Sequence, residues 1–181
     1  MNSKKILIVL LLIIIFILFL LLYRNYKNNE EIIIGNGFGL ILDRKSVISE
    51  LENIEDELNI NVSNIKSMEL SDVFNNEVYW NIELDNNIFI KFDAINRKIK
   101  NYKDNNDYTN EITQYIKYDE AEKFIIDKYI NLGYNKEYNL QGITKKDNTY
   151  LWEAIFVTEN DKIEFKFIPE INKIISIDSV Q

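Results

Sequence analysis

The sequence predicts an α+β fold: a single N-terminal transmembrane helix, then two α-β-β-β units, each a helix packed on a curved antiparallel sheet. Three observations predict this fold. An uninterrupted apolar run lies near the N-terminus, two segments have helical periodicity, and two later stretches have strand periodicity and resemble each other. The two similar stretches are Val78 to Tyr102 and Tyr150 to Ile177.

The two strand-rich stretches align through their tryptophans. Trp80 and Trp152 are 72 residues apart, and each lies in a run where apolar residues occupy every second position, as in a half-buried antiparallel strand. In the following strand the spacing is 75, and the aligned residues are Ile88, Ile90 and Phe92 with Ile163, Phe165 and Phe167. The change from 72 to 75 predicts a three-residue insertion in the second hairpin loop, at Thr158 to Lys162, as a duplication would allow.

Two segments carry apolar residues on one face at helical spacing. The first is Asp43 to Leu58, and Asp43 is its predicted N-cap because a carboxylate can accept from the free amides of the first turn. The second is Tyr118 to Leu132, which begins with acidic residues suited to the helix dipole. Gly133 is expected to close this second helix as a left-handed C-cap.

The remaining elements complete the two units. Further strands are expected at Ile65 to Leu70 and near Tyr138 to Ile143, and Asn172 suits a turn position with positive φ. The polar, turn-rich segment Lys103 to Asn110 separates the units. The predicted parts are residues 1–29 as a cytoplasmic tip, anchor and juxtamembrane spacer, residues 37–103 as the first repeat, and residues 114–181 as the second.

The apolar run Ile6 to Leu22 has the length of a membrane anchor. In a helix its 17 residues would span about 26 Å, close to a hydrocarbon core of about 30 Å. A secretory signal is the alternative, because Lys4 and Lys5 precede the run, but no small-residue cleavage site follows it. Arg24 and Lys27 beyond the run are offset by acidic residues, which favours a single-pass protein of the cell membrane with a cytoplasmic N-terminus and an extracytoplasmic C-terminal domain.

The composition excludes several classes of function. The chain has no Cys and no His, which removes thiolate nucleophiles, the commonest metal ligand and the usual general base. A formal net charge of −8 would repel phosphate backbones, so no nucleic acid is expected as a partner. The glycines at positions 35, 37 and 39 match no phosphate-binding motif. No catalytic, metal-binding or cofactor-binding residue is therefore predicted, and no cofactor.

Three short pieces of the sequence resemble the PepSY-like family. They are I-x-x-x-E-A at Ile116 to Ala121, the Trp-centred strand at Leu151 to Phe156, and D-A-x-N-x-K-I at Asp93 to Ile99. The last piece resembles the family's D-x-x-T-G-K-I turn, but it carries Arg97 where glycine is usual. In the second stretch Asn172 takes the glycine position.

An anchor followed by two such units is also similar to the membrane-bound regulators of cell-wall elongation, which carry tandem cystatin-like domains. This resemblance implies a helix lying across a curved antiparallel sheet, twice. It implies a role in binding or restraining a cell-envelope enzyme, either a peptidase or a cell-wall synthase, and it implies no catalytic residues.

The predicted function is a non-catalytic, membrane-anchored and extracytoplasmic regulatory module that binds a cell-envelope protein. Strand edges or the outer face of the sheet are expected to make the contact. The predicted partner-binding residues are the outward alternates of the first Trp strand: Tyr79, Asn81 and Glu83. Trp80 and Trp152 are expected in the core, with a place in the interface as the alternative.

Two other functions stay open. The chain could be a structural subunit of a membrane complex, although the apolar run has no small-x-x-x-small pattern for helix packing. It could also be a hydrolase that uses Ser and Lys or a pair of carboxylates, although no serine lies in a recognisable nucleophile motif.

Overall fold

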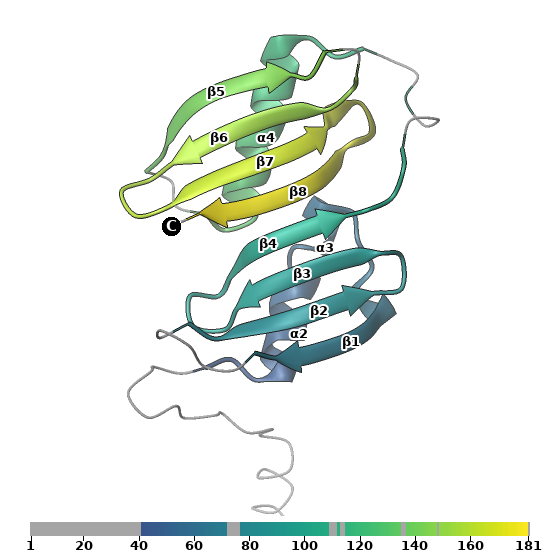
Figure 1. Ribbon diagram of the computed structural model, residues 1–181, viewed down its shortest axis with the longest axis vertical. Helices are drawn as coiled ribbons and strands as arrows, with labels where there is room; N and C mark the ends of the chain where they lie inside the picture. Colours follow the sequence, from purple (N-terminus) through teal and green to yellow (C-terminus); the bar gives the residue numbers. More distant parts are fainter. Residues whose placement is uncertain are drawn as a thin grey trace, which may run out of the picture.

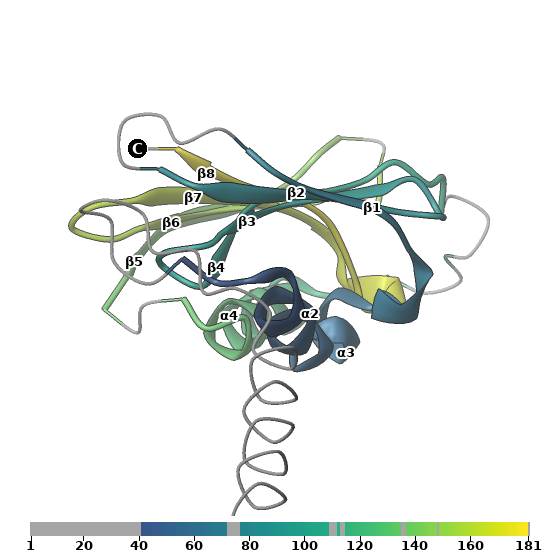
Figure 2. The ribbon, with the colours of Figure 1, turned by 90° about the horizontal axis from the view of Figure 1, so that it is seen from below.

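The described strands of this protein form one antiparallel sheet, and the described helices lie on one face of that sheet (Figures 1 and 2). The computed structural model describes residues 41–71, 77–108, 112, 115–134, 137–147 and 149–180. The sheet has eight strands in the order β1-β2-β3-β4-β8-β7-β6-β5. Each half of the chain contributes four neighbouring strands, and the halves meet where β4 pairs with β8.

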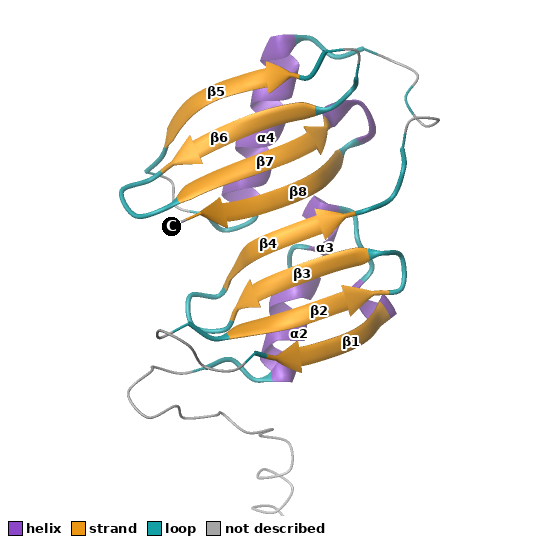
Figure 3. Cartoon of the chain, in the orientation of Figure 1, coloured by secondary structure: helices purple, strands orange, loops and turns teal. Residues whose placement is uncertain are grey.

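The two halves have the same order of elements (Figure 3). The first half contains α2 (Arg44–Glu52), α3 (Glu55–Leu58), β1 (Ile65–Leu70), β2 (Tyr79–Leu84), β3 (Ile88–Asp93) and β4 (Lys98–Asp104). The second half contains α4 (Tyr118–Asn131), β5 (Asn139–Lys145), β6 (Trp152–Val157), β7 (Lys162–Ile168) and β8 (Lys173–Val180). Short 3₁₀ helices, Val62–Asn64 and Pro169–Ile171, precede β1 and β8.

The predicted fold class of two α-β-β-β units, each a helix packed on a curved antiparallel sheet, is wrong. Each half contributes four strands rather than three, and all eight belong to one sheet. The residues that follow the turns at Arg97 and Asn172 form the strands β4 and β8, which the predicted units do not include as fourth strands. Bulges hide their strand periodicity, because Ile99 and Tyr102 lie three residues apart and are both buried, as are Ile174 and Ile177.

The predicted transmembrane helix falls on residues 6–22, which lie outside the described residues. Within the part of the chain that the structure describes, no helix has the length and apolar character needed to cross a membrane.

The caps and turns follow the local chemistry of the sequence. Asp43 is confirmed as the N-cap of α2, since its carboxylate accepts from the Ser46 N–H at 2.7 Å. Gly133 after α4 has φ of 80°, and Asn172 before β8 has φ of 54°. Arg97 occupies the corresponding turn before β4 and also has positive φ, 55°, so a non-glycine residue holds the left-handed conformation in both halves.

The helix predicted over Asp43 to Leu58 is instead two short helices. The N–H of Ile54 bonds to the carbonyl of Leu51 at 3.1 Å, which tightens the end of α2 into a three-residue turn. The chain then restarts as α3, and the fully buried Leu58 at its end still packs into the core.

The core fills the space between the sheet and the helices. Tyr129 of α4 stacks on Phe156 of β6, with ring centres 4.1 Å apart, and both side chains are fully buried. Trp80 and Trp152 are buried as well, which confirms their predicted place in the core. Trp80 pairs with Phe92 across β2 and β3, and Trp152 takes the same position opposite Phe167 in the second half.

Buried ion pairs join the two halves beside the β4–β8 ladder. The Lys173 ammonium lies 3.1 Å from a carboxylate oxygen of Asp104, and the exposed fractions of the two side chains are only 6% and 0%. Lys173 also donates to the Asn59 carbonyl at 3.0 Å. Lys128 of α4 pairs with Glu57 of α3 at 3.0 Å. The halves therefore share charged groups as well as a sheet, and neither is complete without the other.

Replacing Asp104 with alanine should lower the free energy of unfolding by about 3–5 kcal/mol, because Lys173 keeps a buried charge without its carboxylate. Urea denaturation of the purified protein measures the loss. Glu153→Ala is the matched control: its pair with Lys166 is almost half exposed and spans 3.8 Å, so its removal should cost under about 1 kcal/mol. Equal small losses in both variants would contradict this account of the junction.

Replacing Trp152 with alanine should cost about 3–5 kcal/mol of stability, because the change empties a buried ring position opposite Phe167. Chemical denaturation followed by far-UV circular dichroism measures this cost. A loss near zero accompanied by loss of partner binding would instead move Trp152 to an interface.

Candidate interaction surface

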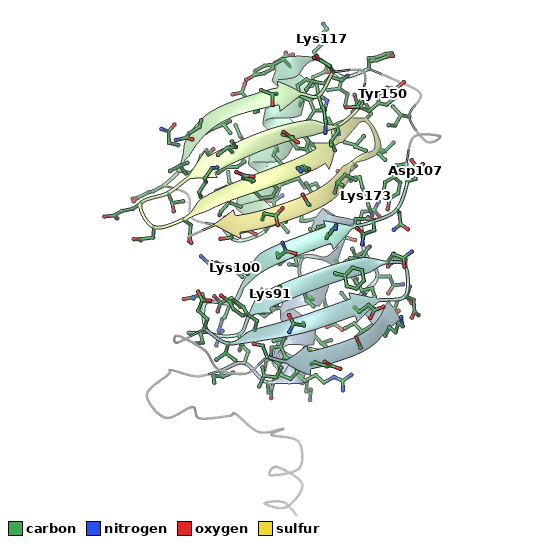
Figure 4. The ribbon with its side chains drawn as sticks, viewed as in Figure 1. Lys91, Lys100, Asp107, Lys117, Tyr150 and Lys173 are labelled. Atoms are coloured by element: carbon green, nitrogen blue, oxygen red, sulfur yellow. The ribbon has the colours of Figure 1, made fainter. Side chains whose placement is uncertain are left out.

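The sheet face opposite the helices is uncovered by any described element, and we call it the open face (Figure 2). Side chains at alternate strand positions point to it. It carries two shallow hollows, one over each half of the sheet. Figure 4 views the molecule from this side and labels Lys91 on β3.

The first hollow has a volume of about 420 Å³ and lies over β1, β2, β3 and β4. Its lining residues from the open face are Ser67, Glu69, Asn81, Glu83, Phe89, Lys91 and Asn101. Phe89 is one of the few large apolar side chains exposed within the described residues, at 42%. An apolar ring among charged and amide groups gives a surface that suits a protein contact.

The three predicted partner-binding residues share β2 but differ in accessibility. Asn81 is exposed and lines the hollow. Glu83 also lines it and pairs with Lys66 of β1 at 2.6 Å. Tyr79 is buried, with only 6% of its surface exposed. Asn81 and Glu83 are therefore available to a partner on the open face, whereas Tyr79 is covered.

Tyr79 is covered by a lysine from the neighbouring strand. The Lys91 ammonium lies 4.0 Å from the centre of the Tyr79 ring, a cation–π contact. Burial, together with a hydrogen bond to Glu77, raises the pKa of the Tyr79 hydroxyl above its usual value. Period-two alternation places Tyr79 on the outer face but cannot show this cross-strand cover.

The second hollow lies over β5, β6 and β7 and has a volume of about 360 Å³. Its open-face lining residues are Gly142, Thr144, Glu153, Ile155, Glu164 and Lys166. Glu153 and Lys166 stand opposite each other in the ladder and form an ion pair of 3.8 Å. The predicted partner-binding residues include no residue of this second hollow, and they include neither Phe89 nor Lys91 of the first hollow. The same alternation, extended to the neighbouring strands, places these residues on the outer face.

The ionisable groups of the described residues are perturbed mainly by the burial of tyrosines. Within the described residues, no group of three or more Asp, Glu, His or Cys side chains could hold a metal ion. The large pKa shifts belong to tyrosines. Burial raises the pKa of Tyr129 to about 12, and it also raises the pKa values of Tyr102 and Tyr134.

Comparison with known proteins gives one structural likeness. No family model matches the chain, and no curated protein sequence matches it. The fold is similar to that of the Bacillus megaterium YpeB C-terminal domain, with a TM-score of 0.53 and 13% sequence identity. The similarity covers 77% of this chain and 64% of that domain.

At 13% identity this likeness concerns the fold alone. Membership of the PepSY-like family rests on the short motifs of the sequence and stays a prediction. The tandem-repeat assignment and the role in the cell envelope stay predictions.

The buried tyrosines make stability depend on pH in alkali. A folded-state pKa of about 12 for Tyr129, against about 10 in the unfolded chain, means that the folded state holds this proton more tightly. Its contribution is therefore complete below about pH 10 and is lost as the pH rises towards 12. Denaturation between pH 9 and 11 should show falling stability with a smaller slope for Tyr129→Phe, and an unchanged slope would contradict the assignment.

Proposed function

We propose that this chain is a non-catalytic regulatory module that binds another protein through the open face of its sheet. The observation that carries the proposal is the pair of hollows on that face, one over each half, with no described element covering them. The mixed charges and the exposed Phe89 give the face the composition of a non-obligate protein interface.

Two further lines support this function. The central β4–β8 pairing makes the open face one continuous surface, and a surface that is already formed loses less entropy when a partner binds. The fold is similar to the YpeB C-terminal domain, and the PepSY-like motifs imply a regulatory role rather than a reaction.

The proposed place of action is the outer side of the cell membrane. The support is the apolar run Ile6 to Leu22, preceded by Lys4 and Lys5, and the proposed partner is a cell-envelope enzyme such as a peptidase or a cell-wall synthase. Membrane fractionation and protease digestion of intact cells test the location. Recovery of the chain in the cytosol, or protection of its C-terminal part in intact cells, would refute it.

Photo-cross-linking in cells tests the contact directly. A photoreactive amino acid at Asn81 or Lys166 should give a covalent adduct with a partner, because both residues are exposed and line the two hollows. The same group at Lys123, an exposed position on α4, is the matched control on the helical face. Mass spectrometry of the adduct then identifies the partner.

Adducts from Asn81 and Lys166 that are absent from Lys123 would support the proposal. An adduct from Lys123 alone would move the contact to the helices. The absence of any adduct at the three positions, in protein that folds normally, would overturn the binding function of the open face.

A further inference from the structure

The two buried tryptophans differ in whether the indole N–H has a hydrogen-bond acceptor. In the first half, a segment of main chain supplies this acceptor. The indole Nε1–H of Trp80 donates to the carbonyl of Leu42 at 2.8 Å. The N–H of the same Leu42 donates to the carbonyl of Ala94 at 2.9 Å. The main chain of Leu42, just before α2, thus hydrogen-bonds both the Trp80 indole N–H and the Ala94 carbonyl.

Within the described part of the corresponding site in the second half, only the tryptophan lacks a partner, because the carbonyl of Pro169, which matches Ala94, accepts from the Asn172 N–H at 3.1 Å. The Nε1 of Trp152 is buried and has no hydrogen-bond partner among the described residues. Ile116 precedes α4 by two residues, as Leu42 precedes α2, but it packs against the core without forming either of the Leu42 bonds. A buried donor without an acceptor costs free energy that an incoming acceptor would restore.

A second buried polar group lies next to this site. Glu170 follows Pro169, which stands 75 residues after Ala94, whereas the first half has the apolar Ile95 at the matching position. The Glu170 side chain is completely buried, and neither carboxylate oxygen accepts a hydrogen bond from the described residues. The Lys145 ammonium is 3.8 Å away, an ion-pair contact beyond hydrogen-bonding distance.

A hollow of about 480 Å³ is connected to these groups through Lys145, although neither Trp152 nor Glu170 lines it, and Tyr150 marks its position in Figure 4. It is lined by Tyr115, Lys145, Lys146, Asp147, Thr149 and Tyr150. The Lys145 ammonium links the hollow to the buried groups, since it lies 5.1 Å from the ring centre of Tyr115 and 5.4 Å from that of Trp152. Tyr115 is 79% exposed, and its ring centre lies 5.6 Å from that of Tyr150.

We propose that this second-half site, the Trp152 slot, binds an extended peptide segment of a partner protein. A carbonyl of the peptide accepts from Trp152 Nε1, a neighbouring N–H donates to Glu170, and a side chain packs on Tyr115 and Tyr150. Main chain is the occupant because main chain fills the matching site in the first half. The half-exposed ring of Tyr118, whose centre lies 6.3 Å from that of Trp152, is a further contact surface for the peptide.

This proposal rests on the proposed function only because it also takes a protein as the partner. The Trp152 slot itself lies apart from the open face. Selection of octapeptides from a phage-displayed random library tests it. The full-length protein in detergent is the target, and the Tyr115→Ala variant removes peptides that bind elsewhere. Because Tyr115 is mostly exposed, this variant should fold as the parent does.

Nuclear magnetic resonance then locates the bound peptide. The chain has two tryptophans, so its spectrum contains two indole N–H signals, which the Trp80→Phe variant assigns. A selected peptide should shift the Trp152 signal and leave the Trp80 signal in place. Trp152→Phe, which keeps a ring but removes the donor, should weaken binding roughly tenfold, whereas Trp80→Phe should not.

Two results would overturn the slot. One is a selection that enriches no peptide for the parent over Tyr115→Ala. The other is a selected peptide that shifts the Trp80 signal or binds Trp152→Phe and Glu170→Gln as tightly as the parent. If photo-cross-links from Asn81 persist in either case, the slot fails while the open-face function stands.

Discussion

The structure depends on the pairing of β4 with β8 at the centre of the sheet. The described ladder between them is short, with the register pairs Asn101–Asp178, Tyr102–Ile177 and Lys103–Ser176. Polar contacts across the junction make up for this length. Lys98 reaches Asp161 at 2.7 Å, and the Tyr134 hydroxyl donates to the Ile99 carbonyl at 2.8 Å.

These contacts favour one arrangement of the halves over all others. A hydrophobic junction could slide, whereas a buried ammonium must keep its carboxylate and carbonyl partners within about 3 Å. Lys173 and Asp104 therefore act as register devices for the whole sheet. The two hollows of the open face lie on either side of the β4–β8 junction. Their relative position therefore depends on the Lys173–Asp104 pair.

The sequence predicted individual helices, caps and turns better than it predicted the pairing of the strands into one sheet. Capping by Asp43 and the positive-φ turns at Gly133 and Asn172 involve neighbours within a few residues, so pattern and propensity suffice. The fourth strand of each half was missed because a bulge breaks its alternation. The single sheet was missed because β4 and β8 lie some 75 residues apart, and no local pattern encodes such a pairing. For the candidate surface, alternation gave Asn81 and Glu83 correctly as accessible, while the burial of Tyr79 depends on Lys91 from another strand.

The order of the strands leaves β1 and β5 as the two outer edges of the sheet. Unpaired edges are templates for other chains, and long flat ones promote aggregation. Here each edge strand carries an irregularity in its pairing, between Ile65 and Ser67 in β1 and between Leu140 and Gly142 in β5. Such bulges increase local twist and interrupt the row of groups that a new strand would need. The two borders of the sheet are therefore poor templates for a further strand, which disfavours the stacking of copies into fibrils.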